Sequence, residues 1–267
     1  MRFAIISDIH LGPERLHNGV QQKLSRFSEK LTENFVDEMN TNIKPKMVIQ
    51  LGDIIQDKNY ELDKVNFEKG IHYLNKLTCP VHHAFGNHDQ RFLTRNDLLT
   101  LTNRPELYYS FDIGNHHCII LYSDDEKKIQ PYIPNEEIDW FKSDIEKTDK
   151  PTIIFVHHIL SDQDLTGNFW FEGKPERCLI QNRSEIRNIL NQSEKVIAVF
   201  QGHAHWNKQE ICNGIPYFTI QSLVENYSNK EIPSGSYAIV DISDGQIAVD
   251  IKGNDSIKMI FLKNNPL

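Results

Sequence analysis

The first 90 residues alternate short apolar runs with longer segments of helical periodicity, and this order restricts the fold more than any other feature of the chain. Residues 3–7, 47–51 and 81–85 are apolar runs that each stop at a polar residue or a glycine, which is typical of buried strands. Between them, apolar residues recur every three or four positions over 16–39 and 62–77, as they do on amphipathic helices. The resulting βαβαβ order predicts a parallel sheet with helices packed on it.

The rest of the chain is richer in strand patterns and contains no repeat, low-complexity tract or linker. We therefore expect 1–267 to form a single α/β domain about two sheets thick, and 267 residues are enough to bury such a core. Asp244 and Gly245 are typical of a hairpin turn between the last two predicted strands. The expected strands are 108–112, 117–122, 152–156, 196–200, 208–212, 215–220, 236–242 and 246–252, and the expected helices are 135–147 and 184–192.

Five of the predicted strands are followed at once by Asp, Asn or His side chains. In open α/β sheets, ligands bind outside the carboxyl ends of the strands, so these side chains are expected to meet in one crevice. Each short motif alone is weak evidence, because Asp-x-His, Gly-Asp and Asn-His also occur in ordinary turns. Their shared position after buried runs is what indicates a site. The motifs are Ser7-Asp8-Ile9-His10, Gly52-Asp53, Gly86-Asn87-His88-Asp89, His157-His158 and Gly202-His203-Ala204-His205.

The donor types at these positions indicate a pair of divalent cations. Imidazole and carboxylate ligands suit Mn, Fe or Zn. The four cysteines are scattered without a CxxC pair, which argues against a thiolate zinc site. Two cations about 3.5–4 Å apart need one shared carboxylate and three further ligands each. Seven side chains supply that number: Asp8, His10, Asp53, Asn87, His157, His203 and His205.

This series of motifs resembles the calcineurin-like metallophosphoesterase superfamily, over about residues 1–225 and with the blocks in the same order. The resemblance implies a four-layer α/β/β/α sandwich with a dinuclear metal centre at the carboxyl ends of the strands. It also implies that Asp53 bridges the two ions and that His88 faces the substrate phosphate and the leaving group. Asp89 would then fix the imidazole of His88. The other ligands divide into Asp8, His10 and His205 for one ion and Asn87, His157 and His203 for the second.

That arrangement predicts how a phosphate ester would be hydrolysed. Two cations, manganese in the first place and iron or zinc as alternatives, would neutralise the ester and lower the pKa of a shared water. The hydroxide so formed would attack phosphorus in line with the leaving oxygen, which His88 would stabilise or protonate. His158 is expected to have a structural or supporting role rather than to bind metal.

Finer similarities bear on which phosphoester is the substrate. Stretches 50–55 and 81–88, and the tail from Gly214 through Glu225 to Ser236, are similar to the manganese-dependent ADP-ribose/CDP-alcohol diphosphatases. That group tends to have Gln where this chain has His10, whereas Asp-x-His is the pattern of cyclic-nucleotide and glycerophosphodiester phosphodiesterases. We therefore expect a hydrolase of phosphodiester or diphosphate bonds in small, nucleotide-like molecules.

Three alternatives stay open at this point: a phosphomonoesterase or a DNA nuclease of the same superfamily, and a metal-binding interaction module without turnover. The protein-phosphatase branch is disfavoured because its Arg-Gly pair is missing after Asp57. A net charge of −8 and a pI near 5.8 disfavour a nucleic-acid partner. The presence of His88 argues against a module without turnover, and the oligomeric state is left open.

Candidate substrate contacts are the least constrained part of the prediction. Phe169 and Trp170 lie in an aromatic run between two ligand motifs, where they would stack on a base, close over the site, or pack as a hydrophobic plug. Trp206 and Tyr227 follow predicted site loops and are further candidates. The side chains suited to a second phosphate are Arg15, Arg91 and Arg95.

The sequence also bears on the cellular setting. It begins without a signal-peptide pattern, and nowhere do 18 apolar residues run together, so we expect no membrane insertion. The scattered cysteines are typical of free thiols in a reducing compartment. We therefore expect a cytoplasmic protein.

Overall fold

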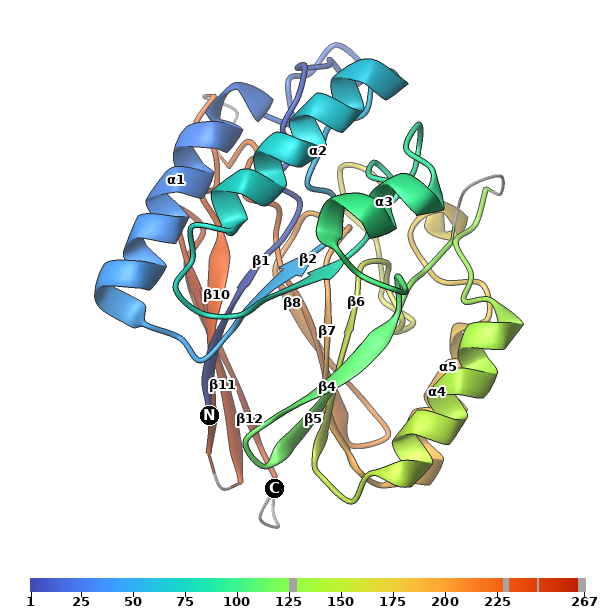
Figure 1. The fold of residues 1–267 in the computed structure, drawn as a ribbon. Helices are drawn as coiled ribbons and strands as arrows, with labels where there is room; N and C mark the ends of the chain where they lie inside the picture. Colours follow the sequence, from blue (N-terminus) through green and yellow to red (C-terminus); the bar gives the residue numbers. More distant parts are fainter. Residues whose placement is uncertain (125–128, 228–230, 244, 264–267) are drawn as a thin grey trace.

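Two six-stranded sheets lie face to face with helices on both outer sides, as the computed structural model shows (Figure 1). The structure describes residues 1–124, 129–227, 231–243 and 245–263. The expected four-layer α/β/β/α sandwich is therefore confirmed.

The first sheet contains the βαβαβ unit that the sequence predicted. Its strand order is β12-β11-β10-β1-β2-β3, with β1, β2 and β3 parallel to one another and the other three strands antiparallel. The strands are β1 (Arg2–Ile6), β2 (Val48–Leu51), β3 (Val81–Ala84), β10 (Tyr237–Ser243), β11 (Gln246–Lys252) and β12 (Ile257–Leu262).

The second sheet has the order β4-β5-β6-β7-β9-β8, and its four central strands run parallel. The antiparallel edge strands β4 and β8 flank these four. The strands are β4 (Tyr109–Ile113), β5 (His116–Ile120), β6 (Thr152–Val156), β7 (Val196–Gln201), β8 (Lys208–Cys212) and β9 (Ile215–Thr219).

Three apolar cores join the layers. Between the sheets, Phe3 packs edge-on against Phe155 and Phe200, with ring centroids 5.9 and 5.7 Å away. A second core lies under the helices of the first sheet, and a third lies under those of the second sheet. The first group is α1 (Ser28–Glu38), η2 (Met39–Ile43), α2 (Tyr60–Leu74) and α3 (Arg95–Thr102), and the second is α4 (Asn135–Lys147) and α5 (Arg183–Ser193). The short helices η1 (Ser25–Phe27) and η3 (Pro175–Arg177) contribute no side chain to either core.

The helix predicted over 16–39 is wrong in its first third. Asn18 and Gly19 both have positive φ, +50° and +78°, and between them they turn the chain so that His17 and Val20 pair. Two consecutive left-handed residues form the type of turn that Asn-Gly favours, and they cannot belong to an α-helix. Leu16 and Val20, read as part of the buried stripe, are 67% and 40% exposed. The helical conformation begins only at η1.

An α-helix and a strand escaped the prediction, as did the single turn of η3, and one predicted turn falls partly outside the described residues. Helix α3 is too short to show periodicity, although Thr94 and Asp97 form a capping box at its start. Strand β12 is an edge strand with mostly exposed side chains, so it lacks a buried run. Asp244 lies outside the described residues, but β10 and β11 pair antiparallel on both sides of it, with Ser243 opposite Gln246.

Candidate metal centre and active site

The predicted ligands leave their strands through unusual backbone conformations. Asp8, His10, Asp53, His203 and His205 all have positive φ, between +52° and +63°. This left-handed region is uncommon for residues with a side chain and costs energy, so such residues cluster at functional sites. Here the left-handed conformation turns the backbone sharply after each of the strands β1, β2 and β7. The side chains of both sheets are thereby directed to one place.

Glycines allow the ligands to approach one another. A Cβ atom at Gly86 would lie 2.2 Å from Oδ1 of Asp53, and one at Gly202 would lie 2.3 Å from Oγ of Ser7. Any larger residue would push the ligand-bearing turns apart. Steric crowding between the ligand-bearing turns therefore explains why a glycine directly precedes Asp53, Asn87 and His203.

One group of ligand atoms forms around Asp8. Its Oδ1 lies 3.2 Å from Nε2 of His205 and 3.8 Å from Nε2 of His10, and the two imidazole nitrogens are 3.0 Å apart. The Oδ2 atom of Asp53 is 3.9 Å from Nε2 of His10. These separations are those of donor atoms that surround a single ion at about 2.0–2.2 Å.

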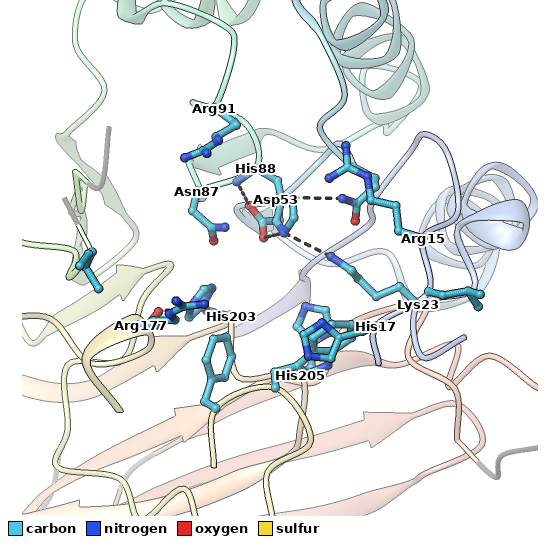
Figure 2. A pocket seen from close by; sticks show the side chains of 15 residues that line it. Arg15, His17, Lys23, Asp53, Asn87, His88, Arg91, Arg177, His203 and His205 are labelled. Atoms are coloured by element: carbon cyan, nitrogen blue, oxygen red, sulfur yellow. Dashed lines mark hydrogen bonds and ion pairs between the residues drawn. The ribbon is translucent and has the colours of Figure 1, made fainter. Parts of the chain in front are cut away.

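A second group shares Asp53 with the first. The same Oδ2 atom of Asp53 lies 3.4 Å from Nε2 of His157, which is 3.2 Å from Nδ1 of His203. Asn87 follows β3 and faces the same cleft (Figure 2). The structure thus brings all seven predicted ligands together, with Asp53 between the two groups.

The outer nitrogen of each histidine is held by a protein acceptor. His157 Nδ1 donates to the Leu51 carbonyl at 2.8 Å, and His10 Nδ1 contacts the Ile55 carbonyl at 3.3 Å. Such contacts fix the tautomer and leave the other nitrogen as a lone pair that faces inward. The two remaining histidines follow the same rule: His203 Nε2 donates to the Arg177 carbonyl at 3.0 Å, and His205 Nδ1 donates to Oε2 of Glu225 at 2.6 Å.

The carboxylates of this site attract positive charge strongly. Burial alone would lower the pKa of His157 and His205, but the Asp53, Asp8 and Glu225 carboxylates outweigh it. The pKa of His157 rises to about 10 and that of His205 to about 9. The carboxylates therefore make this site favourable for bound positive charge.

The oxygen atoms decide whether metal ions fit. Oδ1 of Asp8, Oδ2 of Asp53 and Oδ1 of Asn87 are buried and have no hydrogen-bond partner among the described residues. The other carboxylate oxygens are satisfied, since Oδ2 of Asp8 accepts from the His203 amide and Oδ1 of Asp53 from the His88 amide. A buried oxygen without a partner is costly unless an ion binds it. These oxygen and nitrogen donors fit two divalent cations of the Mn, Fe or Zn type.

His88 lies beside this cluster. The prediction that Asp89 fixes its imidazole is wrong. Asp57, not Asp89, contacts Nδ1 of His88. The Asp89 carboxylate instead accepts from the amides of Asp53 and Gly86, at 2.8 and 3.0 Å. Asp89 therefore braces the turns after β2 and β3, and its nearness to His88 in sequence was misleading.

The metal-ligand cluster forms the floor of a cleft of about 640 Å³. Arg15 and Lys23 lie on one side of Asp53, and Arg91 and Arg177 lie on the other (Figure 2). Of the predicted phosphate contacts, Arg95 is elsewhere, because it pairs with Glu106 on the surface. A cationic cleft in a chain of net charge −8 is suited to an anionic ligand.

The four predicted aromatic contacts divide between two hollows. Trp170 lines the cleft itself, together with Phe171. Phe169, Trp206 and Tyr227 line a second hollow of about 240 Å³, and Trp170 and His205 line both.

Four residues near the site were missed or left undecided by the sequence. Lys23 falls in the predicted helix and Asp57 enters only a motif comparison, and neither has a local signal that separates it from a surface residue. Glu225 does have one, because 221–226 is unusually polar for a segment that follows a strand, which is a reason to expect it at the site. His158 is buried with its Nδ1 on Ser123 Oγ at 2.7 Å, and its ring packs against His157 and His203.

Comparison with known proteins decides the family. Residues 1–207 match the model of the calcineurin-like phosphoesterases. The chain belongs to this family. It is a metal-dependent phosphoester hydrolase, in agreement with its donor set. Among the described residues, no helix is long and apolar enough to cross a membrane.

Individual proteins of similar sequence or structure extend the comparison. A 3′,5′-cyclic-nucleotide phosphodiesterase from Nostoc sp. is 28% identical over 209 residues, which cover 76% of this chain and 70% of that protein. A manganese-dependent ADP-ribose/CDP-alcohol diphosphatase from Homo sapiens is 22% identical, with 76% of each chain covered. The crystal structure of a dimetal phosphatase from Danio rerio has a TM-score of 0.78 at 16% identity and covers 98% of this chain and 99% of that chain. This last likeness concerns the fold.

Proposed function

We propose that this protein hydrolyses phosphodiester or diphosphate bonds in small, nucleotide-like molecules, with two divalent cations of which manganese is the first choice. The observation that carries the proposal is the set of three buried, unpartnered oxygens that meet inward-facing imidazoles beside His88. The relatives named phosphodiesterase and diphosphatase support the substrate class, and the manganese dependence in one of those names supports the metal.

The ligands divide between the two ions as their contacts suggest. Asp8, His10 and His205 would hold one ion, Asn87, His157 and His203 the second, and Oδ2 of Asp53 both. When bound, the cations supply Lewis-acid neutralisation of the phosphate and a water of lowered pKa.

His88 is suited to serve the leaving group. Asp57 contacts its Nδ1 and fixes the ring, while Nε2 faces the cleft. Burial and the Lys23 ammonium lower the pKa of His88, and the Asp57 carboxylate opposes that shift. A carboxylate in this position orients a histidine that passes a proton to or from a reacting oxygen. We assign His88 to the leaving oxygen and Asp57 to the positioning of His88.

The surroundings of the cluster suit a nucleotide. A volume of about 640 Å³ lies within the range of small-molecule sites. Cations along the walls would bind phosphate oxygens, and Trp170 and Phe171 would offer ring faces to a base. Phe169, Trp206 and Tyr227 line the adjoining hollow and would contact only a substrate that extends into it. Since Cys79, Cys118, Cys178 and Cys212 are free thiols, we also propose a cytoplasmic setting.

The test compares two chromogenic esters with manganese-loaded protein. A strong preference for bis(4-nitrophenyl) phosphate over 4-nitrophenyl phosphate is expected, followed by turnover of ADP-ribose, CDP-choline or a cyclic nucleotide. Preference for the monoester would assign the protein to the phosphomonoesterases instead. Two bound metals without turnover of any of these compounds would contradict the proposal.

A further inference from the structure

Lys23 is a buried cation that faces the cleft and forms no ion pair with the residues that the structure describes. Its exposed fraction is 8%, whereas Arg15, Arg91 and Arg177, which line the same cleft, are exposed. The neighbouring carboxylates of Asp57 and Glu225 are engaged by His88 and His205 instead. A buried ammonium group without a paired carboxylate is unfavourable for folding, so its position calls for a functional explanation.

The backbone holds Lys23 in place. Residue 23 forms a bridge with Glu225, and Leu24 N donates to the Val224 carbonyl at 2.9 Å. Asn226 N donates to the Gln22 carbonyl at 2.7 Å on the other side. The lysine therefore projects from a paired segment rather than from a free loop, and the turn at Asn18 and Gly19 leads the chain into this pairing.

The ammonium group lies beside the atom that we assign to the leaving oxygen. Its Nζ is 3.2 Å from Nε2 of His88 and 5.1 Å from the centre of the Trp170 ring (Figure 2). An ammonium group has three N–H donors. Oxygens that enter between His88 and Trp170 would meet the remaining donors.

We propose that Lys23 is a specificity-determining residue that binds the leaving phosphate of a diphosphate substrate; this rests on the proposed function. A leaving group that contacts Nε2 of His88 also comes within reach of Nζ of Lys23. In a diphosphate, that leaving group is a phosphate with anionic oxygens next to the bridging oxygen. In a nitrophenyl ester, an aromatic ring stands in the same place.

The charge balance of the reaction explains why a cation is needed there. Hydrolysis of a P–O–P linkage forms a bond from the water oxygen to the attacked phosphorus and breaks the bond from that phosphorus to the bridging oxygen. The electron pair stays on the bridging oxygen, so negative charge develops on the departing phosphate in the transition state. One proton of the water then ends on the departing phosphate, and the other stays with the attacked phosphate. Lys23 therefore interacts more strongly with the transition state than with the bound substrate.

The test measures kcat/KM of manganese-loaded protein for ADP-ribose and for bis(4-nitrophenyl) phosphate. For Lys23→Met we expect a loss on ADP-ribose on the order of 10- to 100-fold, the range for a lost charge-assisted hydrogen bond. The loss on bis(4-nitrophenyl) phosphate should be about threefold or less. Lys23→Arg should recover most of the ADP-ribose activity. Lys76→Met is the matched control, because Lys76 also covers an aromatic ring, that of Tyr73, but does not line the cleft.

Two further readouts separate function from structure. Lys23→Met should keep its metal content and should have a Tm equal to or above that of the unchanged protein, since it removes an unpaired buried charge. Equal losses on both substrates, no loss on ADP-ribose, or a lowered Tm that accounts for the loss would overturn the role of Lys23. If the unchanged protein hydrolyses only the nitrophenyl diester, the inference is wrong and the proposed function stands. If it hydrolyses neither compound, the proposed function itself fails.

Discussion

Two clusters of histidine and aspartate in this protein show opposite chemistry with the same residue types. In the metal-ligand cluster, each histidine has one nitrogen held by the protein and the other aimed at unpartnered carboxylate oxygens. In the second cluster, at β4, β5 and α4, both nitrogens of His117 are taken, by Asp112 at 2.7 Å and by Asp144 at 2.9 Å. Ser110 and Lys150 satisfy further oxygens of these carboxylates.

The difference lies in which ligand atoms are left without a partner. In the His117 network the ring nitrogens and the carboxylate oxygens have partners within the protein, so no metal ion is needed to satisfy them. Part of this network is also open to water, since Asp112 is half-exposed. The metal-ligand cluster is buried, and the described part of the chain leaves Oδ1 of Asp8, Oδ2 of Asp53 and Oδ1 of Asn87 without a partner. Counting histidines and aspartates would therefore not separate a metal site from an ion-pair network, whereas the unpartnered atoms do.

The sharpest way to break this comparison is to change the shared carboxylate. Asp53→Asn should lose bound metal and lower kcat/KM at least about 10³-fold, because one charged ligand of both ions disappears. Metal content measured by mass spectrometry, alongside diester hydrolysis, checks the result. His117→Ala is the control, and it should leave both quantities unchanged. Full metal occupancy in Asp53→Asn would contradict the bridging assignment.

Next in size is the change that removes His88. His88→Ala should retain metal and lower kcat about 10²- to 10⁴-fold, the range for loss of a general acid. The same pair of measurements applies. A parallel loss of metal would show that His88 is a ligand and that the division of roles is wrong.

A smaller effect is expected one contact away from the ions. Glu225→Gln keeps an acceptor for His205 but removes its charge, so metal affinity should fall about 10- to 100-fold. Competition with a chelator measures this affinity. Asp144→Asn makes the same type of change next to His117 and should alter neither metal affinity nor turnover. Equal behaviour of the two variants would erase the distinction between the clusters.

The smallest effect concerns the stability of the second cluster. Hydrogen bonds from Lys150 and His117 lower the pKa of Asp112, so its stabilising contribution is present above its unfolded-state pKa and is lost as the pH falls through the folded-state value. Because Asp112 is half-exposed, Asp112→Asn should cost less than about 1 kcal/mol at neutral pH and low salt. Urea denaturation at pH 7 and at pH 3 measures the difference, which should be smaller at pH 3, below the unfolded-state pKa. A penalty that did not shrink in acid would have another cause.

Much of the fold and of the ligand cluster could be predicted because both depend on local patterns. A buried strand is a short apolar run, and parallel strands end at the same edge, so Asp8, Asp53 and Asn87 were expected to be neighbours although they are far apart in sequence. The error at 16–24 has a local cause as well, since the Asn18-Gly19 turn signal was outweighed by the apparent spacing of Leu16, Val20 and Leu24.

The supporting residues could not be found in this way. His88 was assigned Asp89 because the two are adjacent, but a side chain that follows a sharp turn points away from its neighbour, and Asp57 from another strand end contacts the ring. Glu225 reaches His205 across 20 residues, and Lys23 reaches His88 across 65. The periodicity of apolar residues carries no information about contacts between residues so far apart in the sequence.

By itself, the sequence determined the order of strands and helices along the chain, the donor types at the strand ends and the resemblance to the family, because apolar periodicity and short motifs are properties of neighbouring residues. Only the tertiary structure decided which oxygens stay unpartnered, which carboxylate holds His88, and that Lys23 is buried beside it. Those outcomes depend on contacts between distant segments, and such contacts form only when the two sheets pack and their strand ends meet.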